Sequence, residues 1–552
     1  MYIEIVPNRT SPPAILLRES FRDGGQIRKR TLANLSHWEP ARVEALRRAL
    51  RGDFDHLTGG DPICGPVFGV LYALKHVADD LGITGVLGRM RTGKLGLFLT
   101  LARVAHQGSR LSAVRWAQQH AVREVLGVGR FDEDDLYHTL DAVAQRQDHI
   151  EQALYRRYVQ RQGRKPVVFL YDVTSSYLEG EQNALGAYGY NRDGKKGKRQ
   201  IVVGLLTDEA GEPFAVHVFE GNTADPSTVS TPIAILKQRF HVEEVVFVGD
   251  RGMVKAKGKA TLAAERLRYI TALTEPQIRT LLKRGVVQLG QFAEQVSEVQ
   301  AAGRRYILRK NAAEARKAWH RLQDKLHTLH TLVATRNAKV AASPRCQPEA
   351  GLRHLQAWVK RHKLASVVTL RLDGRCLTVD SDAAAQEQTV QLAGCYVLET
   401  DVPSTLLDTQ TAHDRYKDLA HVEYDFRTLK TGLLEVRPIF VRKESRTRGH
   451  VFVCLLALKL SRVLQQRLAA AFGTTQDEPH GVTVPDALAA LNRLCLLTYP
   501  LDETSSVTRL PRPDAQQTRI LQALQVPLPS RGHCRQEHRP PRIAARDCCI
   551  GR

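Results

Sequence analysis

The segment KPVVFLYDVTSSYLEG, residues 165–180, is the first long β-branched and aromatic run in the chain. It follows about a hundred residues of helical periodicity, so it marks the start of a different kind of structure. Two further apolar runs, RQIVVGLLTDEAG and EPFAVHVFEGN, come directly after it and are separated by a DEAGEP turn. These runs predict three strands in an antiparallel meander. Asp172 stands at the middle or end of the first strand.

A fourth strand is predicted in EEVVFVGDRGM, residues 243–253, after an intervening helix. A further helix and a strand, YITAL, complete the order βββαβαβ, which favours a mixed sheet covered by helices. Asp250 lies at the end of the fourth strand. Either aspartate alone equally suits a turn or a helix cap. Two on neighbouring strands favour a shared site, because strand ends line the ligand crevice of open sheets.

A third acid lies in RYKDLAHVEYDFRTLKTG, residues 415–432. At about 100° per residue, a helix places Tyr416, Glu423 and Lys430 on one stripe, and Arg427 falls on it too. A second stripe of apolar residues predicts the packing face. Its members are Leu419, Val422, Phe426, Leu429 and Leu433.

Three converging carboxylates without His or Cys select hard cations such as Mg²⁺ or Mn²⁺. Two such ions can activate a water or a 3′-hydroxyl and stabilise the leaving oxygen of a phosphodiester. We therefore expect Asp172, Asp250 and Glu423 to be metal ligands and catalytic residues. Lys430 would then bind a phosphate further along the strand, and Tyr416 would hydrogen-bond or stack on it.

The composition points to a nucleic-acid partner. The chain has 552 residues, with 80 Lys and Arg against 58 Asp and Glu, a net charge of +22. Such a charge attracts polyanions, although basic proteins without a nucleic-acid partner also exist. No membrane span or secretion signal is expected, and nine scattered cysteines fit free thiols in the cytoplasm.

The length predicts several domains. We expect a strand-rich segment over 1–50, a helical and DNA-binding domain over 51–163, the first part of a catalytic core over 164–275, an insertion over 276–405, the second part of the core with the glutamate helix over 406–480, and a C-terminal region over 481–552 that is poorly ordered from about residue 500.

These motifs together resemble the bacterial insertion-sequence transposases of the DDE type, in the insertion-sequence-four superfamily. That group carries a Tyr–x2–Arg–x3–Glu–x6–Lys pattern, which Tyr416, Glu423 and Lys430 match, while the arginine position holds Leu419. The runs YDVTSSYLEG and VGDRGM are similar to its two aspartate motifs. RPIFVRKESRTRGHVFVCLLAL, residues 437–458, is similar to the segment that follows its glutamate helix, and the beginning of the chain is also similar.

The resemblance implies an α/β fold: an RNase H-like mixed sheet with flanking helices, interrupted by a mainly β insertion and preceded by a mainly helical domain. It implies excision of an insertion sequence by metal-dependent hydrolysis, with two ions, and joining of its 3′ ends to target DNA. The partners would be terminal inverted repeats and target DNA, bound by a homodimer in the synaptic complex, in the cytoplasm at the nucleoid.

Some relatives form a hairpin intermediate that their arginine helps to hold, and Leu419 leaves that step open here. Arg415 or Arg427 are candidates to replace it, and Arg251 either meets a phosphate or neutralises the acids. Two rival functions remain. One is an RNase H-like nuclease that cuts without joining, and the other is an inactive, transposase-derived DNA-binding protein.

Overall fold

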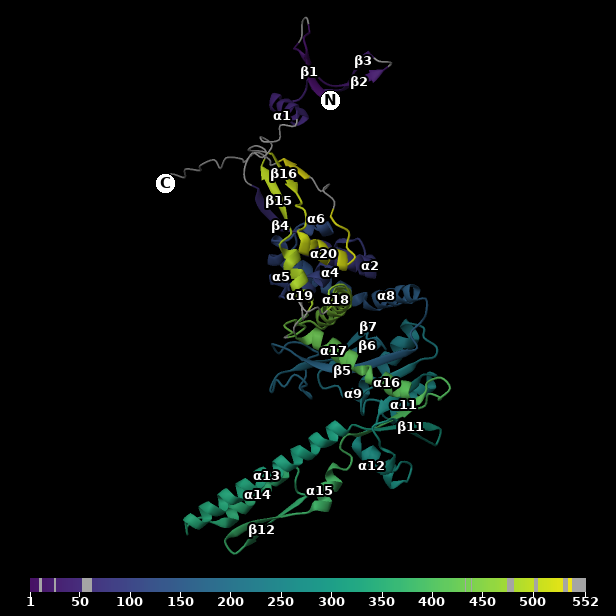
Figure 1. Cartoon of the computed structure of the whole chain (residues 1–552), viewed down its shortest axis with the longest axis vertical. Helices are drawn as coiled ribbons and strands as arrows, with labels where there is room; N and C mark the ends of the chain where they lie inside the picture. The colour runs from purple at the N-terminus through teal and green to yellow at the C-terminus, as the bar shows by residue number, and fades with distance from the viewer. Residues whose placement is uncertain are drawn as a thin grey trace. The chain divides into compact units, whose positions relative to one another are not determined.

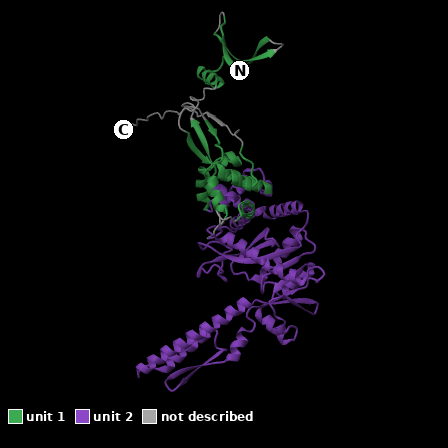
Figure 2. Ribbon diagram, in the orientation of Figure 1, with its two compact units in different colours: residues 1–80, 108–133, 461–552 green, residues 81–107, 134–460 purple. Residues whose placement is uncertain are grey.

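The computed structural model describes residues 1–8, 12–23, 26–51, 62–431, 433–437, 439–473, 481–500, 505–529 and 535–538. The chain divides into two compact units (Figure 2). Unit 1 comprises residues 1–80, 108–133 and 461–552, and unit 2 comprises residues 81–107 and 134–460. Each unit is therefore assembled from segments that are distant in sequence.

The N-terminal part of unit 1 is a three-stranded antiparallel sheet followed by a helix. Its strands are β1 (Tyr2–Val6), β2 (Ala14–Asp23) and β3 (Gln26–Asn34), in the order β1-β2-β3, and the helix is α1 (Pro40–Arg51). Ion pairs tie the strands together, with Glu4 of β1 binding both Arg18 and Lys29.

The second sheet of unit 1 combines one strand from the N-terminal part of the chain with three strands from the C-terminal part. It has the order β17-β16-β15-β4, with β4 (Ile63–Val67), β15 (Cys495–Pro500), β16 (Ser505–Arg509) and β17 (Arg535–His538). The helices α19 (Val484–Asn492) and α20 (Ala515–Ala523) accompany it. The expectation of poor order from about residue 500 is therefore wrong for β16 and α20, because Ile520, Leu521 and Leu524 form a buried helical face. Residues 539–552 lie outside the described part.

The helices expected between residues 66 and 162 are present but are shared between the units. Unit 1 holds α2 (Gly69–Leu81) up to residue 80, α5 (Arg110–Gln118) and α6 (Val122–Leu126). Unit 2 holds α3 (Ile83–Leu87), α4 (Arg91–Ala105), α7 (Glu133–Gln145) except its first residue, and α8 (Gln147–Gln162). Among the described residues, no helix has the length and apolarity needed to cross a bilayer.

Unit 2 is built on a mixed sheet of eight strands in the order β10-β11-β14-β9-β8-β5-β6-β7 (Figure 1). The strands β5 (Val168–Tyr177), β6 (Gln200–Asp208) and β7 (Pro213–Glu220) form the predicted antiparallel meander. β8 (Val246–Gly249) pairs in parallel with β5, and β9 (Arg268–Ala272) pairs in parallel with β8. The predicted order βββαβαβ is thus confirmed in this part of the chain.

Apolar strands explain why this sheet is buried. β6 has every residue buried, a pattern typical of a sheet covered on both faces. One apolar cluster joins the sheet to three helical segments. It includes Tyr155 of α8, Leu236 of η1 (Ile235–Arg239) and Leu262 of α11 (Ala256–Ala264). η1 continues the short helices α9 (Asp225–Thr228) and α10 (Ser230–Ala234). α17 (Leu419–Lys430) contacts β5 and β6, and α18 (Glu444–Ala471) follows it.

The insertion is not mainly β, which corrects the prediction for residues 276–405. Its helices are α12 (Glu275–Lys283), the short η2 (Leu289–Gln291), α13 (Ala312–Ala342), α14 (Pro348–Arg361) and α15 (Ala383–Val390). Three of its strands, β10 (Ser297–Ala301), β11 (Arg304–Lys310) and β14 (Cys395–Thr400), extend the central sheet from the edge of β9. Only the hairpin β12 (Val368–Asp373) and β13 (Cys376–Ser381) stands apart as a two-stranded sheet.

The physical reason is a helical apolar face in α13. Leu322, Leu326, Leu329 and Val333 recur at spacings of four and three and pack against α14 and the β12–β13 hairpin. α13, which has 31 residues, forms the long arm of the insertion together with α14, and the hairpin lies along this arm (Figure 1).

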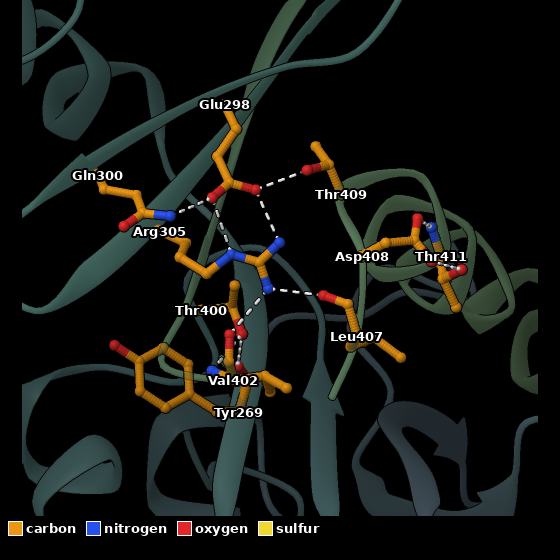
Figure 3. Close-up of polar contacts among 10 residues, drawn as sticks. All are labelled: Tyr269, Glu298, Gln300, Arg305, Thr400, Val402, Leu407, Asp408, Thr409 and Thr411. Atoms are coloured by element: carbon orange, nitrogen blue, oxygen red, sulfur yellow. Dashed lines mark hydrogen bonds and ion pairs between the residues drawn. The ribbon is translucent and has the colours of Figure 1, made fainter. Parts of the chain in front are cut away.

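A buried ion pair fastens the end of the insertion to the sheet (Figure 3). Arg305 of β11 donates from Nε and Nη2 to Glu298 of β10, at 2.9 and 2.7 Å. Its Nη1 donates to the carbonyl oxygens of Val402 and Leu407, at 2.8 and 2.7 Å, and Thr409 donates to Glu298 at 2.6 Å. Thr409 is the first residue of α16 (Thr409–Lys417), so this network fixes where the chain re-enters the core.

This network predicts an acid-sensitive contribution to stability. The Arg305 guanidinium lowers the pKa of Glu298 to about 2, from an unfolded value near 4.5. A carboxylate with a depressed pKa stabilises the fold fully above the unfolded pKa, and this stabilisation is lost as the pH falls from about 4.5 to 2. We expect Glu298→Gln to lower the melting temperature at neutral pH and to flatten its fall in that acidic window. Thermal melts of both proteins across pH test this, and parallel curves would contradict it.

Candidate active site

The two aspartates lie on paired strands of the central sheet. β5 and β8 are parallel neighbours, with Tyr171 opposite Gly249 at the end of their pairing. Asp172 is the next residue of β5, and Asp250 is the residue directly after β8. The register therefore brings together two carboxylates that are 78 positions apart in sequence.

Glu423 reaches the same region from a helix. α17 packs on β5 and β6 through its apolar face, in which Leu419, Val422, Phe426 and Leu429 are buried. Glu423 is exposed on this helix and lines, with Asp250 and Tyr416, a cavity of about 560 Å³. The predicted apolar stripe is confirmed, and it leaves Glu423 at the cavity that Asp250 also lines.

The helix bearing these residues is broken, which corrects the expectation of one continuous helix. α16 ends at Lys417 and α17 begins at Leu419. Asp418, between them, is the C-cap of α16 and the N-cap of α17. Arg415 forms an ion pair with Asp418 across this junction, at 3.2 Å. Tyr416 is thus on α16, whereas Glu423 and Lys430 are on α17.

Asp172 carries the strongest electrostatic signature of the three acids. Its pKa is raised to about 7, first by burial and then by the negative charges of Asp250 and Glu423. The backbone N–H of Val173, which donates to Oδ1 at 2.7 Å, opposes this shift, as does the charge of Arg192. The three carboxylates therefore repel one another, and a cation between them would relieve the repulsion.

Tyr416 is held against one of the aspartates. Its hydroxyl donates to Oδ1 of Asp250 at 3.1 Å. Burial first, and then the charge of Asp250, raise the pKa of Tyr416, so the phenol stays protonated and remains a donor. One oxygen of Asp250 is therefore engaged with α16 in this arrangement.

The chemistry of these donors fits a hard divalent cation. Asp172, Asp250 and Glu423 offer only carboxylate oxygens, which Mg²⁺ and Mn²⁺ prefer. Within the described ranges, no group of three or more His, Cys, Asp or Glu is arranged to hold a metal ion. The charges of the three acids act on one another, but their carboxylate oxygens do not form a closed coordination shell.

Lys430 is engaged by a residue that the sequence did not single out. Its Nζ donates to Oδ1 of Asp193 at 2.8 Å, and Arg437 forms an ion pair with the same carboxylate. The other oxygen of Asp193 accepts from the backbone N–H of Tyr177 at 3.1 Å. Asp193 is the single acid of the basic segment NRDGKKGKRQ, residues 191–200, whose composition is typical of a solvated turn. Only the structure identifies it as an anchor for α17.

This anchor predicts a large loss of stability when it is removed. The side chain of Asp193 is 2% exposed, so Asp193→Ala leaves Lys430 and Arg437 without their shared carboxylate in a buried position. We expect a loss of about 3 kcal/mol. Asp380→Ala, which breaks the exposed pair with Arg371, is the control and should cost less than about 1 kcal/mol. Equal melting temperatures for the two variants would contradict the anchor role.

The remaining predicted DNA contacts differ in their surroundings. Arg251 is exposed and lines the cavity beside Asp250 and Glu423. Arg427 is exposed on α17, and Arg415 is half-buried in its pair with Asp418.

The cations from the insertion that line the cavity carry no signal in the sequence that would connect them with the three acids. Arg309, Lys310 and Arg316, all from the insertion, line it together with Leu419. Leu419 stands at the arginine position of the family pattern, and no periodicity in the sequence connects it with residues about a hundred positions earlier.

Family models match two segments of this chain. The model described as the transposase DDE domain matches residues 163–460, more than half of the chain. This protein is a DDE transposase. The N-terminal residues 3–60 match the N-terminal domain of the IS1634 family transposases, which places the transposase among those of bacterial insertion sequences.

Other comparisons are more distant. No curated protein matches the transposase. Eight chains of solved structures match it, among them one described as a cryo-EM structure of piggyBac transposase synaptic complex with hairpin DNA. That match has 8% sequence identity and a TM-score of 0.36, and it covers 77% of this chain and 75% of the other.

Proposed function

We propose that this transposase excises an insertion sequence by hydrolysis of DNA strands and joins the freed 3′ ends to target DNA. The observation that carries the proposal is the electrostatic influence of Asp250 and Glu423 on Asp172, with Asp172 on β5, Asp250 directly after the paired strand β8, and Glu423 on a helix packed against β5. The strand order β7-β6-β5-β8-β9, with its antiparallel meander and two parallel strands, supports an RNase H-like core.

In this proposal Asp172, Asp250 and Glu423 hold two Mg²⁺ or Mn²⁺ ions. When bound, such ions supply an activated oxygen nucleophile and stabilise the leaving oxygen of the phosphodiester. Release of Asp250 from Tyr416 would free a carboxylate oxygen for this role, and the freed phenol would donate to DNA.

The DNA contacts assigned to this site follow from exposure and charge. Arg251 and Arg427 are exposed cations near the acids, and we assign them to phosphates. Lys430 is assigned to DNA in a state where it exchanges Asp193 for a phosphate, and Arg415 is a candidate once Asp418 releases it. Because Leu419 stands where the family pattern has arginine, we assign no residue to a hairpin intermediate.

The partners in this proposal are the terminal inverted repeats and the target DNA. Two DNA ends must be held together before joining, so the working complex is a homodimer. The reaction takes place in the cytoplasm, where the protein binds the nucleoid.

The test uses the full chain and a plasmid carrying the element with its flanking DNA. We expect Mg²⁺-dependent strand cleavage at the element ends and joining of a pre-cut 3′ end to a second plasmid. Cleavage without joining would identify a nuclease and overturn the proposal. Binding without either reaction would identify an inactive DNA-binding protein.

A further inference from the structure

The cavity beside the acids is lined by more cationic than anionic side chains. Five cationic side chains line it, and we call them the basic wall. They are Arg251, Arg309, Lys310, Arg316 and Lys417. The carboxylates that line it are Asp250, Glu294 and Glu423, and two of these are the proposed metal ligands. Cations gathered around one cavity repel one another, so this arrangement favours an anion.

Three members of the wall come from the base of the insertion. Arg309 and Lys310 end β11, and Arg316 lies in the second turn of α13. Ala312 and Ala313, the first residues of α13, also line the cavity, so the positive end of a 31-residue helix opens into it. The helix dipole and the side chains therefore act on the same space.

Arg309 is held in place by a partly buried network around His413. Its Nε donates to the carbonyl oxygen of Glu294 at 2.9 Å, and its Nη1 donates to Nε2 of His413 at 3.1 Å. Tyr396 also hydrogen-bonds Nε2 of His413, and Nδ1 of His413 faces Asp414 at 3.0 Å. His413 is fully buried, and this burial lowers its pKa, so the neutral ring accepts at Nε2. A guanidinium fixed in this way keeps further N–H groups for a ligand.

We propose that the basic wall is a binding subsite for the DNA backbone, holding a phosphate next to the one positioned at Asp250 and Glu423. This inference rests on the proposed function and adds how the insertion takes part in it. The contact is made by the base of the insertion, where β11 meets α13, and not by the distal β12–β13 hairpin. Fixed Arg309 orients the phosphate, and the exposed Arg316 and Lys417 complete the positive surface.

The test compares two double variants with the same net charge. Arg309→Ala/Arg316→Ala removes two cations of the basic wall. Lys317→Ala/Arg371→Ala removes two exposed cations outside it, one on α13 next to Arg316 and one on the hairpin. Because both lose two positive charges, the long-range attraction of DNA falls equally in both, and only the location differs.

Binding of a fluorescein-labelled DNA duplex of arbitrary sequence is measured in EDTA over a range of salt concentrations. We expect the basic-wall variant to bind about tenfold more weakly than the control variant, and its slope of log K against log salt to be shallower by about one. Equal affinities and slopes for the two variants would overturn the subsite.

Folding is checked by thermal melts. If Arg309→Ala is unstable because His413 loses its donor, Lys310→Ala/Arg316→Ala takes its place with the same expected outcome. EDTA separates this inference from the catalytic proposal. Wild-type cleavage with equal binding by both variants would refute the subsite alone, whereas absence of wild-type cleavage would refute the transposase reaction.

Discussion

Replacing Glu423 by Gln should abolish DNA strand cleavage while DNA binding stays close to the wild-type level. Glu423 is exposed on α17 and lies outside the buried apolar face of that helix, so the fold does not depend on its charge. Gln has nearly the same shape but lacks the negative charge that a hard cation needs. We expect cleavage to fall by at least about a thousandfold, or roughly 4 kcal/mol of transition-state stabilisation.

The measurement is Mg²⁺-dependent cleavage of plasmid DNA, with binding to a labelled duplex measured in parallel. Glu349→Gln, an exposed acid on α14, is the matched control and should keep full activity. Near-normal cleavage by the Glu423 variant would remove it from the catalytic set. Loss of binding as well as cleavage would point to a structural role for this residue.

The strand pattern of the core was predictable because its signals are local. The β-branched runs that contain Asp172 and Asp250 are long, apolar and bounded by turns, and each forms a strand in the structure. The two strands were also expected to be neighbours, and β8 does pair in parallel with β5, although β6, β7 and a helical segment lie between them in sequence.

Other features depend on tertiary contacts that local patterns do not reveal. The periodicity of residues 415–432 fits one helix, but Asp418 ends α16 and begins α17, and its carboxylate binds Arg415 instead of capping either helix. Asp193 belongs to a Gly- and Lys-rich turn by composition, yet it is buried under Lys430, 237 positions away. The basic wall likewise joins residues from the insertion to Lys417 of α16 and to Arg251, which follows β8.

The insertion shows a third kind of limit. The resemblance implied a separate, mainly β insertion, and no local pattern indicates that β10, β11 and β14 join the core sheet instead. Backbone pairing between β14 and β9 extends the core sheet, and the helices α13 and α14 then form their own apolar cluster. A resemblance to relatives with a β insertion therefore predicted the wrong composition for this chain.

The second large effect should be on stability. A substitution at Asp172 that abolishes strand cleavage should make the folded protein more stable. Asp172 lies in the middle of β5 with buried residues on either side, beside two other carboxylates. Asp172→Asn removes the charge without changing the shape. In EDTA near pH 8 we expect the variant to be more stable than the wild type by about 1–3 kcal/mol, because the charged form is both desolvated and repelled there.

The pH dependence follows from the direction of the shift. The folded pKa of Asp172, about 7, is above its unfolded value near 3.8. Between these values the native state keeps a proton that the unfolded state has lost, so wild-type stability falls as the pH rises from about 4 to 7. The advantage of the variant should therefore be largest near pH 8 and vanish near pH 4, as thermal melts at both pH values would show.

Mg²⁺ provides the decisive control for this prediction. An ion that binds the folded state raises its stability, so Mg²⁺ should raise the melting temperature of the wild type and leave that of Asp172→Asn nearly unchanged. The variant should also have lost strand cleavage. A variant that is less stable than the wild type in EDTA near pH 8 would contradict the prediction. It would mean that the Asp172 carboxylate stabilises β5 through its contact with Val173, and that this structural role outweighs the repulsion between the acids.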